Sequence, residues 1–95
     1  MQAFPQKATA GSANKVLIVE DHRDSREALK ALFEAFGYRV IEATNGREGV
    51  QAALASRPST ILMDIMMPEM DGFDATRRIR AMPELAHIPI IAVTA

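Results

Sequence analysis

Acidic side chains stand directly after several short apolar runs of this sequence. Glu20 and Asp21 follow one such run, and Asp64 ends another within the segment ILMDIMMPEMDG. Carboxylate oxygens, without cysteine or paired histidines, suit Mg²⁺ better than zinc. A carboxylate beside a bound magnesium ion can act as a nucleophile toward phosphorus and form an aspartyl phosphate. Asp64 is therefore a candidate phosphoryl acceptor, and Thr94, which follows a further apolar run, is a candidate polar neighbour.

Each of these residues also has a simpler explanation when it is taken alone. Asp64 could cap a turn or helix that happens to follow a core strand. The pair Glu20 and Asp21 could be a solvated strand end, and Thr94 could be only a β-forming residue. The choice between these explanations depends on whether the fold brings the residues together.

Four short runs rich in branched apolar residues predict strands that are buried on both faces. They are Lys15–Val19, Tyr38–Ala43, Thr60–Met63 and Ile88–Val93. Because each run is too short for a typical helix, we expect strands at all four places.

The first of three predicted helices lies between the first two strands. Apolar residues recur there at helical spacing, from about Arg23 to a stop at Gly37. The apolar stripe comprises Ala28, Leu29, Leu32, Phe33 and Phe36.

Two further helices are predicted from their capping residues. Asn45, with Glu48 three residues later, has the spacing of a capping pair, and Pro58 ends the helix that they open. Asp71 can cap the third helix. The inner face of that helix is expected to carry Phe73 and Ile79.

The alternation of strands and helices predicts an α/β fold with a doubly wound parallel sheet. Ligands of such sheets bind beyond the carboxyl ends of the strands, near the point where the strand order reverses. If the first and third strands are neighbours, Glu20, Asp21 and Asp64 share one small cleft. Carboxylates so close together repel one another, so either some are protonated or a cation such as Mg²⁺ lies among them.

Length and composition predict one small domain. The chain has 95 residues, a net charge of −1 and no cysteine, and neither a long apolar run nor a secretory signal pattern is present. These features give no reason to expect contact with nucleic acid or membrane, and they agree with a cytoplasmic location. Residues 1–14 lack periodicity and are expected to be a disordered leader to a domain at 15–95.

The acidic pair Glu20-Asp21, the segment MDIMMPEMDG around Asp64, and Thr94-Ala95 after PIIAV together resemble the receiver domain of two-component response regulators. The resemblance implies a flavodoxin-like fold and a phosphoacceptor domain that modifies only itself. Asp64 would accept a phosphoryl group from a sensor histidine kinase or phosphotransfer protein, and Thr94 would act as the conformational switch.

The resemblance also implies a ligand set for Mg²⁺. Asp21 and Asp64 would bind the ion directly, Glu20 would act through water, and the main-chain carbonyl of Met66 would supply a further oxygen. Pro68 and Gly72 would shape the loop after the acceptor.

The sequence departs from the resembled family after the fourth strand. The family continues with a helix, a strand that carries a lysine, and a final helix, whereas the lysines here are Lys7, Lys15 and Lys30. The domain is therefore expected to be incomplete, and either to self-associate through the unpaired fourth strand or to be only loosely folded. A receiver-like interaction module, or an inactive fragment, that is not phosphorylated stays an alternative. An aspartate-nucleophile phosphatase is disfavoured, because Met66 stands where its acid–base carboxylate would be.

Overall fold

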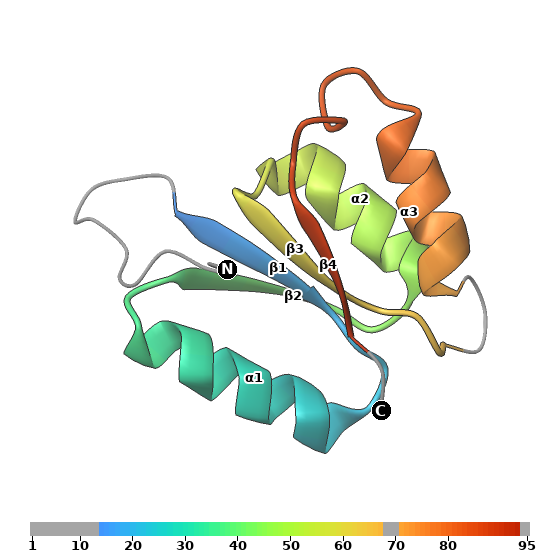
Figure 1. The fold of residues 1–95 in the computed structure, drawn as a ribbon. Coiled ribbons are helices and arrows are strands. Elements are labelled where there is room, and N and C mark those ends of the chain that lie inside the picture. Colours follow the sequence, from blue (N-terminus) through green and yellow to red (C-terminus); the bar gives the residue numbers. More distant parts are fainter. Residues whose placement is uncertain (1–13, 68–70, 94–95) are drawn as a thin grey trace.

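The structure, a computed structural model, describes residues 14–67 and 71–93 and contains alternating strands and helices (Figure 1). The elements are β1 (Lys15–Val19), α1 (Arg23–Ala35), β2 (Arg39–Ala43), α2 (Gly46–Ser56), β3 (Thr60–Asp64), α3 (Gly72–Arg80) and β4 (Ile90–Val93). Most of the predicted leader, together with Pro68 and Thr94, lies outside the described residues. No helix in the described part of the chain is long and apolar enough to cross a membrane.

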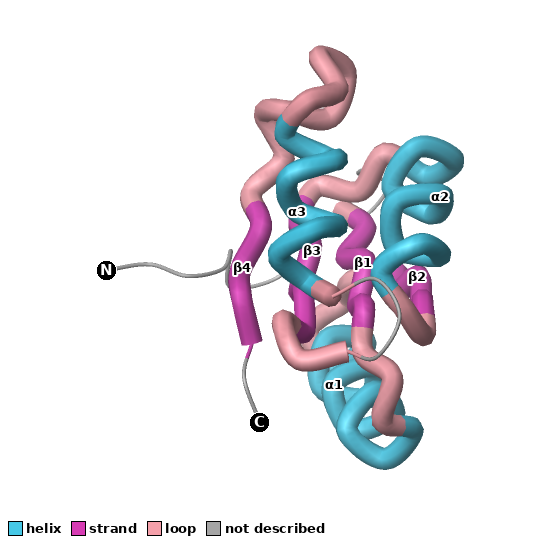
Figure 2. Tube along the Cα trace, turned by 90° about the vertical axis from the view of Figure 1, so that its right-hand side faces the viewer, coloured by secondary structure: helices cyan, strands magenta, loops and turns pink. Residues whose placement is uncertain are grey.

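The strands form one parallel sheet in the order β2-β1-β3-β4. Figure 2 shows this order, and Figure 1 shows α1 on one side of the sheet with α2 and α3 on the other. The predicted α/β, doubly wound parallel fold is confirmed. The strand order reverses beside β1, so the carboxyl ends of β1 and β3 lie at the position where such sheets bind ligands.

The core has two parts because alternate side chains of each strand point to opposite faces of the sheet. Leu17 and Val19 pack toward α2 and α3, in a cluster that includes Ile61 and Met63. The residues on the other face pack with α1 and include Val16, Ile18, Phe33, Tyr38 and Leu62. With helices on both faces, β1 and β3 read as continuous apolar runs rather than as alternating ones.

The predicted capping residues have the expected contacts. The side chain of Asn45 accepts a hydrogen bond from the Glu48 amide at 2.9 Å, and that of Asp71 accepts one from the Asp74 amide at 2.9 Å. Gly37 follows α1 with a φ of 91°, a conformation that glycine adopts without a Cβ clash. These contacts place the start of α2 and α3 and the end of α1 close to where the sequence predicts them.

The start of β2 and the end of β3 differ from the prediction. Strand β2 begins at Arg39 rather than Tyr38, because the Tyr38 amide donates to the Phe33 carbonyl at the end of α1. Strand β3 extends to Asp64, which pairs with Val93 of β4. The candidate acceptor is therefore the last residue of a strand, and the sheet itself holds its main chain.

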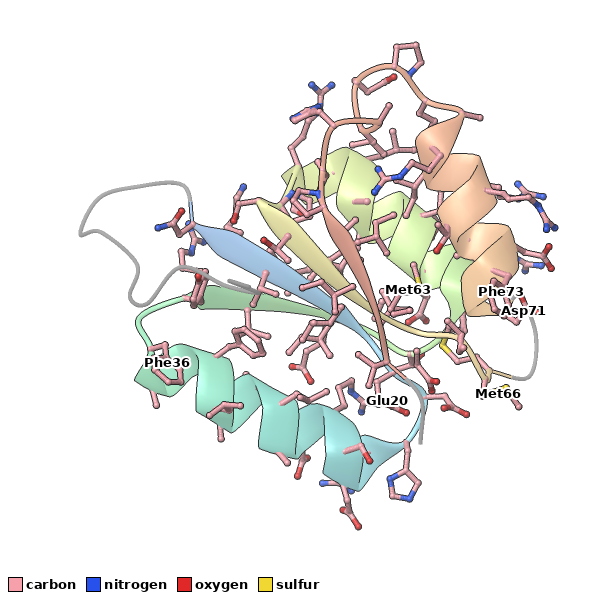
Figure 3. The ribbon with its side chains drawn as sticks, viewed as in Figure 1. Glu20, Phe36, Met63, Met66, Asp71 and Phe73 are labelled. Atoms are coloured by element: carbon pink, nitrogen blue, oxygen red, sulfur yellow. The ribbon has the colours of Figure 1, made fainter. Side chains whose placement is uncertain are left out.

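The predicted inner position of Phe73 is wrong. Phe73 is 59% exposed, whereas Ala75 and Ile79 of α3 are fully buried. Because each helical residue turns by about 100°, residues 73 and 79 point about 120° apart around the helix, so both cannot lie at the centre of the face that meets the sheet. Figure 3 shows Phe73 near Asp71 at the start of α3.

The apolar stripe of α1 and the fourth strand are also less buried than predicted. Leu32 is 50% and Phe36 47% exposed, although Phe33 on the same helix is buried. The last strand begins at Ile90 and is only partly covered. The sheet order explains this difference for β4, because it is an edge strand among the described residues.

Candidate acidic site

The three predicted carboxylates meet at the carboxyl ends of β1 and β3. The strands are paired so that Val19 lies opposite Met63, and Glu20 and Asp64 follow directly. One side-chain oxygen from each of Glu20, Asp21 and Asp64 lies within 4.8 Å of the other two. The strand order thus brings together residues more than forty positions apart in the sequence.

Glu20 and Asp64 are largely withdrawn from water, whereas Asp21 is exposed. Glu20 is 9% and Asp64 7% exposed. Burial raises the pKa of Glu20 above its ordinary value of 4.5, and the nearby carboxyl groups of Asp64 and Asp21 raise it further. A hydrogen bond from the His22 amide, 3.0 Å from the Glu20 carboxylate, acts in the opposite direction. Repulsion within this cluster is what a bound cation would relieve.

The loop after β3 orients the Asp64 side chain. The Met66 amide donates a hydrogen bond to Asp64 Oδ1 at 2.9 Å. Met66 is 70% exposed, and its main-chain amide is the group that contacts Asp64. Figure 3 shows Met66 near the start of the loop that leaves β3. The role of the Met66 carbonyl as a metal ligand stays a prediction.

A cleft of about 580 Å³ lies over the three carboxylates. Its lining comprises Glu20, Asp21, His22, Ser25, Leu29, Asp64, Met66 and Val93. The apolar wall, with Leu29 from α1 and Val93 from β4, was not predicted from the sequence. A signal for part of it exists, because Ser25 and Leu29 are four residues apart and share one face of a helix. The neighbour of Val93, the predicted switch Thr94, lies outside the described residues.

The donor atoms of the site fit a magnesium ion. All three side chains of the cluster offer hard oxygen ligands, which Mg²⁺ prefers. Oxygens bound to one Mg²⁺ at about 2.1 Å lie at most about 4.2 Å apart. The three oxygens of the cluster, all within 4.8 Å of one another, lie near this span.

Comparison with known proteins decides the family. A family model described as "Response regulator receiver domain" matches residues 16–95. The chain belongs to this receiver family. The resemblance inferred from the acidic pair and the Asp64 segment is thereby confirmed.

Relatives of this receiver domain include a named response regulator. The polar-differentiation response regulator DivK of Brucella anthropi is 45% identical over 80 residues, which are 84% of this chain and 65% of DivK. Protein PilH of Pseudomonas aeruginosa is 41% identical over 80 residues, 84% of this chain and 66% of PilH. The chain thus spans about two thirds of the length of these relatives.

Solved receiver structures share the fold. The N-terminal domain of a response regulator receiver protein from Methanoculleus marisnigri superposes with a TM-score of 0.84 at 36% identity, covering 88% of this chain and 68% of that one. The receiver domain of sensor histidine kinase PA1611 from Pseudomonas aeruginosa also has a TM-score of 0.84, at 38% identity, covering 88% and 69%. That structure contains a magnesium ion coordinated in its active-site cleft.

Proposed function

We propose that this receiver domain takes a phosphoryl group onto Asp64 from a phosphohistidine of a sensor histidine kinase or phosphotransfer protein. The observation that carries the proposal is the position of Asp64, a nearly buried strand residue in a cleft with two further carboxylates. An oxygen of Asp64 forms a bond to phosphorus as the bond from phosphorus to the histidine nitrogen breaks, and the electron pair of that bond stays with the histidine.

The cluster would hold Mg²⁺, which supplies charge neutralisation of the phosphoryl oxygens when bound. Asp21 and Asp64 would bind it directly, Glu20 through water, and Met66 through its main-chain carbonyl. The Met66 amide keeps Asp64 Oδ1 in place within the loop. The residues of this chain thereby orient the nucleophile, and apolar side chains such as Leu29 and Val93 form part of the cleft around it.

Thr94 would report the phosphoryl group by moving toward its oxygens. Its neighbour Val93 lines the cleft and supports this assignment. The domain would then act as a cytoplasmic signalling switch that changes partners, without direct contact with nucleic acid or membrane. It catalyses only its own phosphorylation and dephosphorylation.

Phosphorylation by a small donor tests this function. The chain, and any longer native protein that contains it, should gain one phosphoryl group from acetyl phosphate in the presence of Mg²⁺ and none with chelator. Asp64→Asn should abolish the gain, because the nucleophilic oxygen is replaced by an amide. The matched control Asp24→Asn changes an exposed aspartate of α1 and should leave the gain intact.

The readout is intact mass, followed by peptide mapping of the modified residue. A phosphoryl group on another residue would contradict the role of Asp64. Absence of phosphorylation in the chain and in the longer protein alike would favour the alternative of a receiver-like interaction module.

A further inference from the structure

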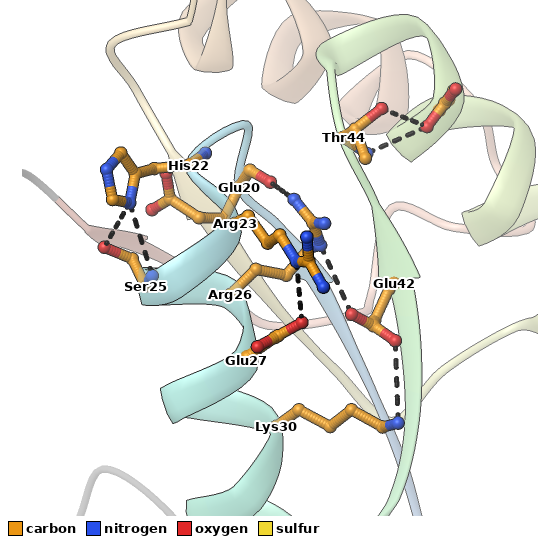
Figure 4. A network of polar contacts seen from close by, with 10 residues as sticks. Glu20, His22, Arg23, Ser25, Arg26, Glu27, Lys30, Glu42 and Thr44 are labelled. Atoms are coloured by element: carbon orange, nitrogen blue, oxygen red, sulfur yellow. Dashed lines mark hydrogen bonds and ion pairs between the residues drawn. The ribbon is translucent and has the colours of Figure 1, made fainter.

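We propose that Arg26 is a positioning residue for the metal site, because it holds the peptide group that joins Glu20 to Asp21. The Arg26 Nη1 atom donates to the main-chain oxygen of Glu20 at 3.0 Å (Figure 4). This contact is to the main chain, so Arg26 does not occupy the carboxylate oxygens. The inference rests on the proposed function, since it concerns the same magnesium site.

Fixing the Glu20 oxygen fixes the direction of Asp21. The carbonyl of Glu20 and the amide nitrogen of Asp21 belong to one planar peptide group. The amide of Glu20 is held as well, by a hydrogen bond to the Ala43 carbonyl at 3.0 Å. Because hydrogen bonds hold both the amide and the carbonyl of Glu20, the main chain has one orientation at Asp21. Asp21 is itself exposed and depends on this anchoring for its position.

Glu42 of β2 orients the arginine. The Arg26 Nε atom lies 3.2 Å from Glu42 Oε1, and the Arg26 side chain is only 15% exposed. Lys30 approaches the other oxygen of Glu42 at 3.8 Å. The planar guanidinium has donors in a fixed fork, so it can serve the Glu20 carbonyl and the Glu42 carboxylate together. A lysine at position 26 has a single ammonium group and cannot reproduce this pair of directed contacts.

If Arg26 positions the site, its replacement should weaken metal binding. If Arg26 acts only through its charge, its replacement should strengthen metal binding. A nearby positive charge repels a cation, so removal of the charge alone would strengthen metal binding. Loss of the hydrogen bond to the Glu20 carbonyl would instead weaken it, because Asp21 is no longer held. The direction of the change therefore separates the two roles.

The test measures Mn²⁺ affinity by electron paramagnetic resonance for the wild-type chain, Arg26→Gln and Arg26→Lys. Both variants should bind Mn²⁺ about tenfold more weakly, the scale of one lost hydrogen bond from a charged group. The control Arg39→Gln removes an exposed arginine at the start of β2, the end of the sheet away from the acidic site, and should bind as the wild type does. Urea unfolding identifies the fraction folded, so that affinities are compared for folded protein.

Unchanged or tighter binding in folded Arg26→Gln would overturn the proposal. A second measurement that needs no metal keeps the proposal testable if a variant folds poorly or if the wild type binds no Mn²⁺. The amide NMR signal of Asp21 should shift in Arg26→Lys and stay in place in Arg39→Gln, and an unmoved signal in Arg26→Lys would also overturn the proposal. Absence of Mn²⁺ binding by the wild type contradicts the proposed function itself, which separates the two failures.

Discussion

At the scale of single residues, the carboxylates that would bind a metal ion also lower the stability of the metal-free fold. Glu20 and Asp64 are buried beside one another, and the exposed Asp21 adds further negative charge. Burial of carboxylates of like charge beside one another costs free energy, and the raised pKa of Glu20 reflects that cost. A cation that binds only the folded chain would offset it. We therefore expect Mg²⁺ to raise the melting temperature of this domain.

Asp21→Ala should abolish this metal effect. Loss of an outer-shell partner typically lowers metal affinity by about 10-fold to 100-fold, and loss of a direct ligand should exceed about 100-fold. Because Asp21 is exposed, its removal should leave the metal-free melting temperature nearly unchanged. Calorimetric titration with Mg²⁺ and thermal unfolding measure both quantities, with Asp24→Ala as the control. Affinity equal to wild type in Asp21→Ala would remove this residue from the site.

At the scale of elements, the site depends on how closely α3 approaches the end of β3. A Cβ added at Gly72 would lie 2.3 Å from the main-chain oxygen of Asp64 and 2.5 Å from the Cα of Ile65. These atoms are main chain and cannot rotate aside. The absence of a side chain at Gly72 thus allows the first turn of α3 to rest against the segment that carries the acceptor.

Gly72→Ala should therefore displace the Asp64–Ile65 segment. We expect a loss of about 1–3 kcal/mol in the free energy of unfolding, the usual cost of overpacking, together with weaker Mn²⁺ binding. Gly49→Ala is the matched control, because its Cβ would meet side-chain atoms of Val19, the nearest at 2.9 Å, and alanine favours a helix by about 1 kcal/mol. Urea unfolding and Mn²⁺ titration compare the two. Equal effects of both substitutions on Mn²⁺ affinity would contradict this account.

The start of α2 should contribute to the acid sensitivity of the fold. The Glu48 carboxylate accepts hydrogen bonds from the Thr44 side chain at 2.7 Å and from the Thr44 amide at 2.8 Å, which lower the pKa of Glu48 below its ordinary value of 4.5. A lowered folded-state pKa stabilises the fold above the unfolded-state value, and this stabilisation is lost as the pH falls through the folded-state pKa.

Glu48→Gln should therefore be less stable than the wild type at pH 7, with the difference closing as the pH falls below about 4.5. Glutamine can still accept from Thr44 but carries no charge. Urea unfolding between pH 3 and pH 7 checks this, with the exposed Glu34→Gln as the control. A difference that stays constant across this range would show that the charge of Glu48 is not involved.

At the scale of the whole molecule, the sheet is covered unevenly. Strand β4 is paired only with β3 among the described residues. On the face that carries α1, the side chains of Ile91 and Val93 are only partly buried, and Leu32 of α1 is half exposed. An edge strand of branched apolar residues beside partly covered apolar surface favours association with another chain.

The 95-residue chain should therefore self-associate through β4. Ala92→Lys places a charge at an exposed position of this edge and should shift the chain toward the monomer, because edge charges oppose strand pairing. The control Ala31→Lys adds the same charge at an exposed position of α1 and should not. Light scattering over a concentration series, with hydrogen exchange of the β4 amides, measures the association. A wild-type monomer at all concentrations, with protected β4 amides, would contradict the prediction.

Local patterns in the sequence determined the elements of this protein and the chemistry at their ends. The apolar runs before Glu20 and Asp64 could be assigned to strands because such short runs are typical of buried parallel sheets. Asn45 and Asp71 could be assigned to helix starts because their side chains bond amides only three residues away. Each of these inferences depends only on residues a few positions apart in the chain, so the sequence alone is enough to make it.

Only the tertiary structure decided what depends on contacts between distant segments. The meeting of Glu20 with Asp64 requires β1 to lie beside β3, and a local pattern does not specify lateral order. The exposure of Phe73 was missed because apolar character alone does not reveal which face of a short helix meets the sheet. The contact of Arg26 with the Glu20 carbonyl was also hidden, because a main-chain oxygen has no signature in the sequence. The sequence thus determined which residues could do chemistry, and packing of the sheet decided which of them act together.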